Sequence, residues 1–106
     1  MKQQERPSAN FAGALRAARR AQGTTQEAFD LVSSRTYVSA LERGIKNPTL
    51  PKVDQLAEVL RMHPLSVLML AYLLKVDGTA PSLDELIGTV RSEVAHVVAT
   101  AGLDDS

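Results

Sequence analysis

Apolar residues recur every three or four positions along most of the chain, which is the spacing of one face of an α-helix. The first such stretch follows Asn10, a residue type that caps helix N-termini, and it ends at Gly23. Phe11, Leu15 and Ala18 share its apolar face. Because no stretch alternates apolar and polar residues as a β-strand does, the pattern predicts an all-α fold.

Hydroxyl-bearing residues indicate where the next two helices begin. Residues 24–27, Thr-Thr-Gln-Glu, have the form of a capping box, so we expect a short second helix there. Ala28 and Phe29 are its expected inward contacts. Ser33 and Ser34 are small residues that favour caps and turns, and a third helix is expected to begin at one of them.

The third helix is expected to run to about Glu42 and to end near Gly44. Val38 and Leu41 lie three positions apart and are predicted to face inward. Its other face carries Arg35, Thr36, Ser39, Ala40 and Arg43. Arginine, hydroxyl groups and a small alanine on one exposed face indicate a surface made for binding.

Prolines mark the next two helix starts. After a loop at residues 47–49, Pro51 suits the first turn of a fourth helix. His63 and Pro64 interrupt this helix, and residues 65–76 beyond them are apolar nearly all round. Such a helix must be covered on several faces, and a fold of this size has little material to cover it.

The last helix is expected after a turn at residues 77–81. Residues 82–85, Ser-Leu-Asp-Glu, form a second capping-box sequence. The apolar positions beyond it are separated by alternating steps of four and three: Leu83, Ile87, Val90, Val94, Val97 and Ala101. This is the spacing of a seam between packed helices.

Charge is distributed unevenly, although the formal net charge is zero. Residues 1–52 contain nine Lys or Arg against four Asp or Glu, whereas residues 53–106 contain three against eight. The first half therefore carries a net charge of +5 and the second half −5. This segregation indicates that the first half faces a polyanion.

Composition excludes several classes of chemistry. The chain has no cysteine, and His63 and His96 each lack a second ligand at helical spacing, so we expect no metal and no cofactor. No nucleophile lies beside a base and no glycine-rich phosphate loop is present, so we expect no enzyme. The N-terminus lacks the apolar core of a signal peptide, and the longest apolar run is about half a membrane span, so we expect a cytoplasmic protein with no membrane partner.

Four segments carry a resemblance to a known family: LRAAR (15–19), GTTQEAF (23–29), RTYVSALERG (35–44) and NPTL (47–50). Together they resemble the Cro/CI-type (XRE-like) helix-turn-helix proteins of phages and bacteria. The resemblance covers about half the chain. It implies a compact five-helix DNA-binding domain with a recognition helix at about residues 34–42 in the major groove.

The resemblance also implies roles for individual residues. Arg35 is expected to bond guanine, Ala40 to leave room for a thymine methyl, and Gln26 to clamp a phosphate. Arg19 and Glu42 are expected to form a structural ion pair that fixes the angle of the third helix. The full set of expected DNA contacts is Gln26, Ser34, Arg35, Thr36, Tyr37, Ser39, Ala40, Arg43, Lys46 and Asn47.

The chain departs from the family in the segment before the third helix. Two residues fewer than usual separate Phe29 from Arg35, Asp30 stands where the family has alanine, and the customary glycine of the turn is absent. We therefore expect a shorter second helix or a tighter turn. A small rotation of the third helix would change which side chains reach the groove.

A single recognition helix reads few base pairs, so a homodimer on a palindromic operator is expected. The expected dimer contacts are Leu68, Tyr72, Leu83, Ile87, Val90, Val94 and Val97. The domain organisation is then a flexible tail at 1–9, the DNA-binding domain at 10–76, a dimerisation helix at 77–102 and a flexible tail at 103–106. Alternatively, the last helix folds back over the fifth within one chain.

The expected function is a transcriptional regulator that binds double-stranded DNA. Two alternatives remain open. One is an antitoxin or a restriction-modification controller of the same fold, and the other is a protein-interaction adaptor that has lost DNA binding.

Overall fold

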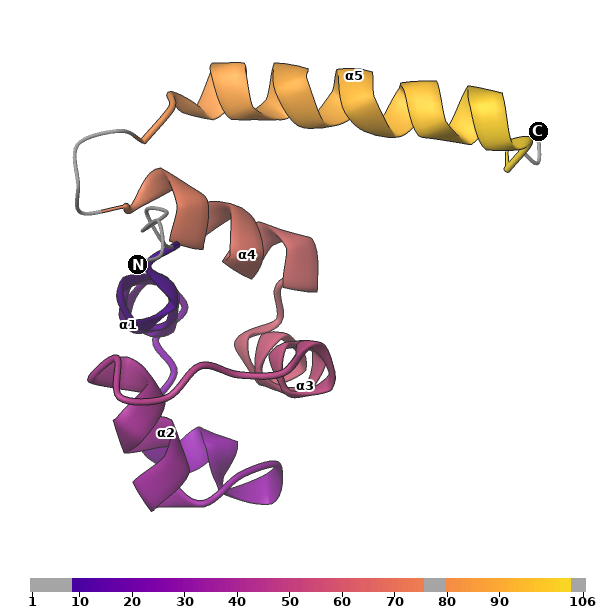
Figure 1. The fold of residues 1–106 in the computed structure, drawn as a ribbon. Coiled ribbons are helices and arrows are strands. Elements are labelled where there is room, and N and C mark those ends of the chain that lie inside the picture. The colour runs from indigo at the N-terminus through magenta and orange to yellow at the C-terminus, as the bar shows by residue number, and fades with distance from the viewer. Residues whose placement is uncertain (1–8, 76–79, 104–106) are drawn as a thin grey trace, which may run out of the picture.

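The computed structural model describes residues 9–75 and 80–103, and these residues form six helices and no strand. The elements are α1 (Phe11–Ala21), the 3-10 helix η1 (Gln26–Leu31), α2 (Arg35–Glu42), α3 (Leu50–Leu60), α4 (Pro64–Leu73) and α5 (Leu83–Ala101). The all-α prediction is confirmed. Figure 1 shows that the first five helices form a bundle, with α5 on the far side of α4 from α2.

Three helices begin at the predicted caps, namely Asn10 for α1, Ser34 for α2 and Ser82 for α5. Each cap oxygen accepts a backbone N–H three residues on, at 2.8 to 3.1 Å. At α5 the bond is reciprocal, because Glu85 Oε1 accepts the Ser82 N–H at 3.0 Å. The predicted capping box at residues 82–85 is therefore confirmed.

The capping box predicted at residues 24–27 is wrong. The N-cap of η1 is Thr25, and its side chain makes no capping hydrogen bond. Phe29 is fully buried as expected, but Ala28 is exposed. The shortened segment explains the 3-10 form, since such a helix rises about 2.0 Å per residue against about 1.5 Å for an α-helix. A 3-10 helix therefore spans the distance to the start of α2 with fewer residues than an α-helix would need. The expectation of a shorter second helix is confirmed.

The core lies where α1, η1, α2, α3 and α4 meet. Its fully buried large side chains are Leu15, Phe29, Val38, Leu41, Leu56, Leu60 and Val67. The inward faces expected for the first and third helices are those observed. One compact core therefore fixes how these five helices are oriented.

The break between α3 and α4 lies at the predicted place. Arg61 adopts a left-handed conformation with φ of 61°, and the two helices are bent by 102°. His63 then caps α4, because its Nδ1 accepts the Leu65 N–H at 3.0 Å. Among the described residues, no single helix is long and apolar enough to cross a membrane.

The C-terminal part leaves much apolar surface uncovered. In α4 only Val67 and Ala71 are buried, while Leu65 and Tyr72 are exposed. Helix α5 has no buried residue. α4 ends at Leu73, so the predicted continuation of this helix through residues 74 and 75 is wrong. Residue 76 and most of the following turn lie outside the described residues, as do the tails at 1–8 and 104–106.

Candidate nucleic-acid interface

Helix α2 is anchored by one apolar face and by one buried carboxylate. Val38 and Leu41 are fully buried, and Glu42 at the end of the helix is only 6% exposed. A buried carboxylate requires charged or hydrogen-bonding partners, because burial removes its water. The neighbours of Glu42 therefore determine how α2 is held.

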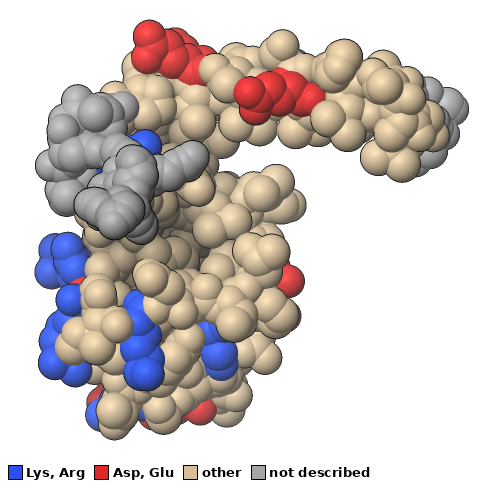
Figure 2. Space-filling view, in the orientation of Figure 1, with Lys and Arg blue, Asp and Glu red and all other residues tan. Residues whose placement is uncertain are grey.

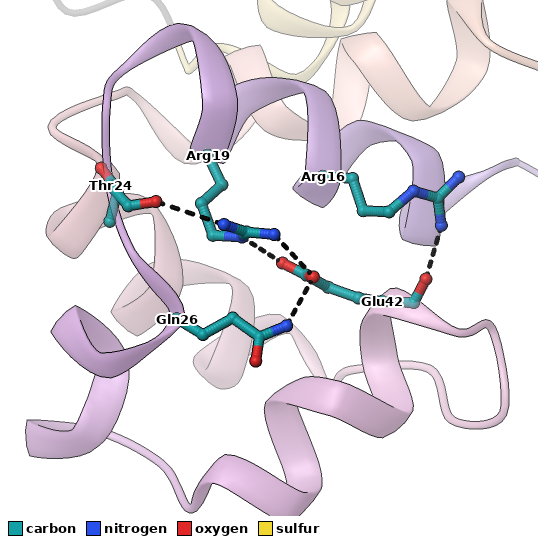
Figure 3. A network of polar contacts seen from close by, with 5 residues as sticks. All are labelled: Arg16, Arg19, Thr24, Gln26 and Glu42. Carbon is teal, nitrogen blue, oxygen red and sulfur yellow. Dashed lines mark hydrogen bonds and ion pairs between the residues drawn. The ribbon is translucent and has the colours of Figure 1, made fainter.

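Glu42 receives hydrogen bonds from two other elements, as Figure 3 shows. Arg19 of α1 forms a two-pronged ion pair, with Nε 2.6 Å from Oε2 and Nη2 3.1 Å from Oε1. Gln26 of η1 donates from Nε2 to Oε1 at 2.8 Å. Arg16 donates to the backbone carbonyl of Glu42. The predicted Arg19–Glu42 contact is present, and it joins α1, η1 and α2.

The charges of this network stabilise one another. Burial alone would raise the pKa of Glu42, but the hydrogen bonds from Arg19 and Gln26 and the attraction of Arg19 and Arg16 outweigh it. The pKa of Glu42 is therefore lowered from its ordinary value of 4.5. The hydrogen bond to Glu42 likewise raises the pKa of Arg19. Both side chains thus remain charged at neutral pH.

The exposed face of α2 carries most of the predicted DNA contacts. Ser34, Arg35, Thr36 and Arg43 are exposed, and Ser39 is half-buried. Ala40 is only 6% exposed, and its carbonyl accepts the N–H groups of the returning residues Ile45 and Lys46. The methyl group of Ala40 therefore offers little exposed surface, and its expected contact with a thymine methyl stays a prediction.

Arg35 lies at the first position of α2 but is not free of partners. Its Nη2 lies 3.3 Å from Oε2 of Glu27, and its Nε lies 3.4 Å from Oδ1 of Asp30. Sequence reasoning missed these ion pairs. The departure at Asp30 was the available signal, but the distance across the shortened segment depends on the 3-10 form of η1.

Tyr37 is half-buried and packs against the core. Lys52 of α3 places its Nζ 5.6 Å from the centre of the Tyr37 ring and donates to the carbonyl of Val32 at 2.7 Å. This lysine, which sequence reasoning also missed, ties α3 to the turn before α2. A favourable cation–π contact adds to that tie.

The loop after α2 presents the remaining predicted residues. Gly44 ends the helix with φ of 76°, a conformation that glycine adopts without strain. Beyond it Lys46 and Asn47 are exposed. Arg43 is also exposed, and its Nε donates to the carbonyl of Ser39 at 3.3 Å. Three exposed polar side chains therefore directly follow α2 and form what we call the basic edge: Arg43, Lys46 and Asn47.

Charge follows this geometry. On the face shown in Figure 2, Lys and Arg gather over the part of the molecule that contains α1 and α2, whereas α5 shows Asp and Glu. The charge segregation of the sequence is thus also a segregation in space. Among the described residues, no three His, Asp or Glu side chains are grouped closely enough to hold a metal ion.

Comparison with known proteins identifies the domain. Residues 15–66 match the family model described as helix-turn-helix, from α1 to the start of α4. No curated protein and no solved structure gives a match to the chain. The match spans η1 and α2, the buried Arg19–Glu42 pair and the basic edge described above. Residues 15–66, just under half of the chain, therefore form a helix-turn-helix domain of the Cro/CI-type (XRE-like) kind, which is typical of DNA-binding regulators.

Proposed function

We propose that this protein is a transcriptional regulator that binds a palindromic DNA operator as a homodimer, with α2 in the major groove. The observation that carries the proposal is the seating of α2. Its inner face is fixed by the core and by Glu42, and its outer face presents Arg35 and Thr36 beside the basic edge. The major groove admits one α-helix with such donors on its outer face.

The side chains divide into base contacts and backbone contacts. Arg35 has a guanidinium with several donors, which suits the two acceptors of guanine, O6 and N7. The hydroxyls of Ser34, Thr36 and Ser39 suit bases or phosphates. Arg43, Lys46, Asn47 and Tyr37 suit the sugar-phosphate backbone on either side.

Gln26 suits a phosphate contact at the start of η1. Its amide nitrogen donates one hydrogen to Glu42 and carries a second. The same side chain then links the buried carboxylate to the DNA backbone. A phosphate contact there would transmit the position of the backbone to α2.

The exposed seam of α5 supports the homodimer. Leu83, Ile87, Val90, Val94 and Val97 are 37–54% exposed. Tyr72 on α4 is 48% exposed, and Leu68 lies half-buried between the core and the side of α4 that faces α5. A row of apolar side chains at steps of three and four suits a second copy of the same helix around a two-fold axis.

A two-fold dimer sets the form of the operator. Two copies of α2 would enter successive major grooves about 34 Å apart, so the half-sites would repeat in inverted order about one helical turn apart. The acidic balance of the second half of the chain suits a location away from DNA.

Selection of bound duplexes from a random DNA library tests whether the protein binds DNA in a sequence-specific way. The selected duplex and a scrambled version are titrated at two salt concentrations with the wild type, Arg35→Ala and Arg91→Ala. Arg91, on α5, provides a matched loss of one positive charge. We expect an inverted repeat, binding that weakens steeply with salt, and loss of preference in Arg35→Ala only. Enrichment of no motif, with equal weak binding to both duplexes, contradicts the regulator and favours an adaptor.

Sedimentation velocity tests the homodimer. Val94→Glu places a charge in the seam, and Ser92→Glu places the same charge on the opposite face of α5. We expect the first variant to be a monomer that binds the inverted repeat at least tenfold more weakly, and the second to behave as the wild type. A monomeric wild type would contradict the seam as a dimer contact.

A further inference from the structure

Two carboxylates from η1 hold the guanidinium of Arg35. Asp30 contacts it along one edge, with Oδ1 3.4 Å from Nε and Oδ2 3.5 Å from Nη2. Glu27 places Oε2 3.3 Å from the same Nη2. All three side chains are exposed, at 57% for Arg35, 49% for Asp30 and 69% for Glu27. The Nη1 group takes part in none of these contacts.

The charge at this end of α2 is therefore negative. Two carboxylates surround one guanidinium, which leaves a net charge of −1 for the three groups. The N-terminus of a helix ordinarily attracts phosphate, because its free N–H groups point outward. Here the two carboxylates oppose that attraction. A phosphate that approaches Arg35 meets a cation already paired with two anions.

A guanine base meets a different environment. Its O6 and N7 accept hydrogen bonds but carry no formal charge, so the carboxylates repel it far less than they repel a phosphate. Asp30 also holds the Nε–Nη2 edge, so the Nη1 group carries the donors that neither carboxylate contacts. Pairing with Asp30 therefore favours a neutral acceptor over a charged one.

We propose that Asp30 and Glu27 are specificity-determining residues that restrain Arg35 from phosphates and so weaken binding to DNA of arbitrary sequence. This inference rests on the proposed DNA contact of Arg35. Binding to arbitrary DNA comes almost entirely from the attraction between cations and phosphates. An Arg35 that is neutralised in the free protein adds little to that attraction.

The test measures the affinity of Asp30→Asn and Glu27→Gln for the scrambled duplex and for the selected duplex. Each variant removes one negative charge and keeps the size of the side chain. Glu93→Gln, on α5, is the matched control because Glu93 is exposed and lies on the helix farthest from α2. Thermal unfolding of each variant confirms that the fold is retained. The affinities are compared at low salt, since exposed charges are screened beyond about 10 Å at 0.1 M, and a series of salt concentrations gives the salt dependence.

We expect each η1 variant to bind the scrambled duplex roughly fivefold more tightly, because the released Arg35 gains an attraction to phosphate in addition to the loss of one exposed like charge. The slope of log affinity against log salt should steepen by about 1 as Arg35 gains a phosphate. The preference for the selected duplex should fall. Scrambled-duplex affinity that is unchanged, or changed as much in Glu93→Gln, overturns the inference.

A double variant shows whether Asp30 acts through Arg35. In an Arg35→Met background, Asp30→Asn should tighten scrambled-duplex binding by clearly less than fivefold, because no arginine remains to be released. An equal effect in both backgrounds overturns the role of the pair. Failure of the proposed function is a separate result, in which the wild type binds the selected and scrambled duplexes equally.

Discussion

The bundle of α1 to α4 and the helix α5 both carry apolar side chains at helical spacing but have very different surroundings. Every α-helix of the bundle contributes at least two buried apolar side chains, such as Leu15 of α1 and Leu56 of α3. α5 contributes none, although its apolar positions are as regular. An apolar stripe on a helix therefore indicates that this face is to be buried. It does not indicate whether the same chain or another molecule buries it.

This contrast affects stability as well as assembly. The bundle is stabilised by its own core. α5 has 19 residues and a complete capping box, yet a helix in a protein owes most of its stability to tertiary packing rather than to its own propensity. Under the proposed homodimer, the partner subunit supplies the packing that the monomer lacks. Variants of the two regions should therefore behave differently in dilute solution.

The largest difference is expected from loss of apolar side chains. Leu56→Ala creates a cavity in the bundle and should lower its free energy of unfolding by about 4 kcal/mol. Leu83→Ala should cost less than about 1 kcal/mol in the monomer, because the side chain is 51% exposed. Urea denaturation at dilute concentration measures both. Equal losses would contradict the division into a self-sufficient bundle and a dependent helix.

A loss of charge at Glu42 is the next largest effect. Glu42→Gln should destabilise the bundle by roughly 2 kcal/mol, somewhat less than the loss of a fully buried ion pair, because Arg19 is 19% exposed. Glu93→Gln makes the same change on α5 and should be nearly neutral, since Glu93 is exposed. Thermal unfolding followed by circular dichroism compares the two variants, and similar melting temperatures would show that the buried network contributes little.

Acid should weaken the bundle through the same residue. Glu42 has a lower pKa in the folded protein than in the unfolded chain, so its ionised form stabilises the fold at pH values above about 4.5. That stability is lost as the pH falls from there through the lowered pKa. Urea denaturation from pH 7 to pH 3 should show a smaller pH dependence in Glu42→Gln. An undiminished pH dependence would assign acid sensitivity to other carboxylates.

The smallest effect is expected at the helix caps. Ser82→Ala removes the cap of α5 and should cost about 1 kcal/mol of local helix stability, without lowering the melting temperature of the bundle. Ser34→Ala removes the cap of α2 and should cost the bundle about the same amount. Circular dichroism measures both the helix content and the cooperative thermal unfolding of the bundle, and the two quantities together distinguish Ser82→Ala from Ser34→Ala. A lower melting temperature in Ser82→Ala would show that α5 unfolds with the bundle.

Sequence reasoning succeeded where the deciding interactions are local. The caps at Asn10, Ser34 and Ser82 were predictable, because each bonds a backbone N–H three residues away. It failed at Thr24, where the 3-10 form of η1 replaces the expected α-helical turn. The Arg19–Glu42 pair was predictable only through resemblance to a family, since nothing local joins residues so far apart in the chain.

Amino-acid type and spacing by themselves determined the all-α fold, the apolar faces and the basic character of the first half, because these depend on neighbours within one or two helical turns. Only the tertiary structure decided which exposed-looking residues are covered. Ala40 is buried although it lies among the polar residues of α2, and Arg35 is paired with Asp30 across a shortened segment. Both outcomes depend on where the chain runs after it leaves a helix, and that path is set by packing over the whole bundle rather than by local propensity.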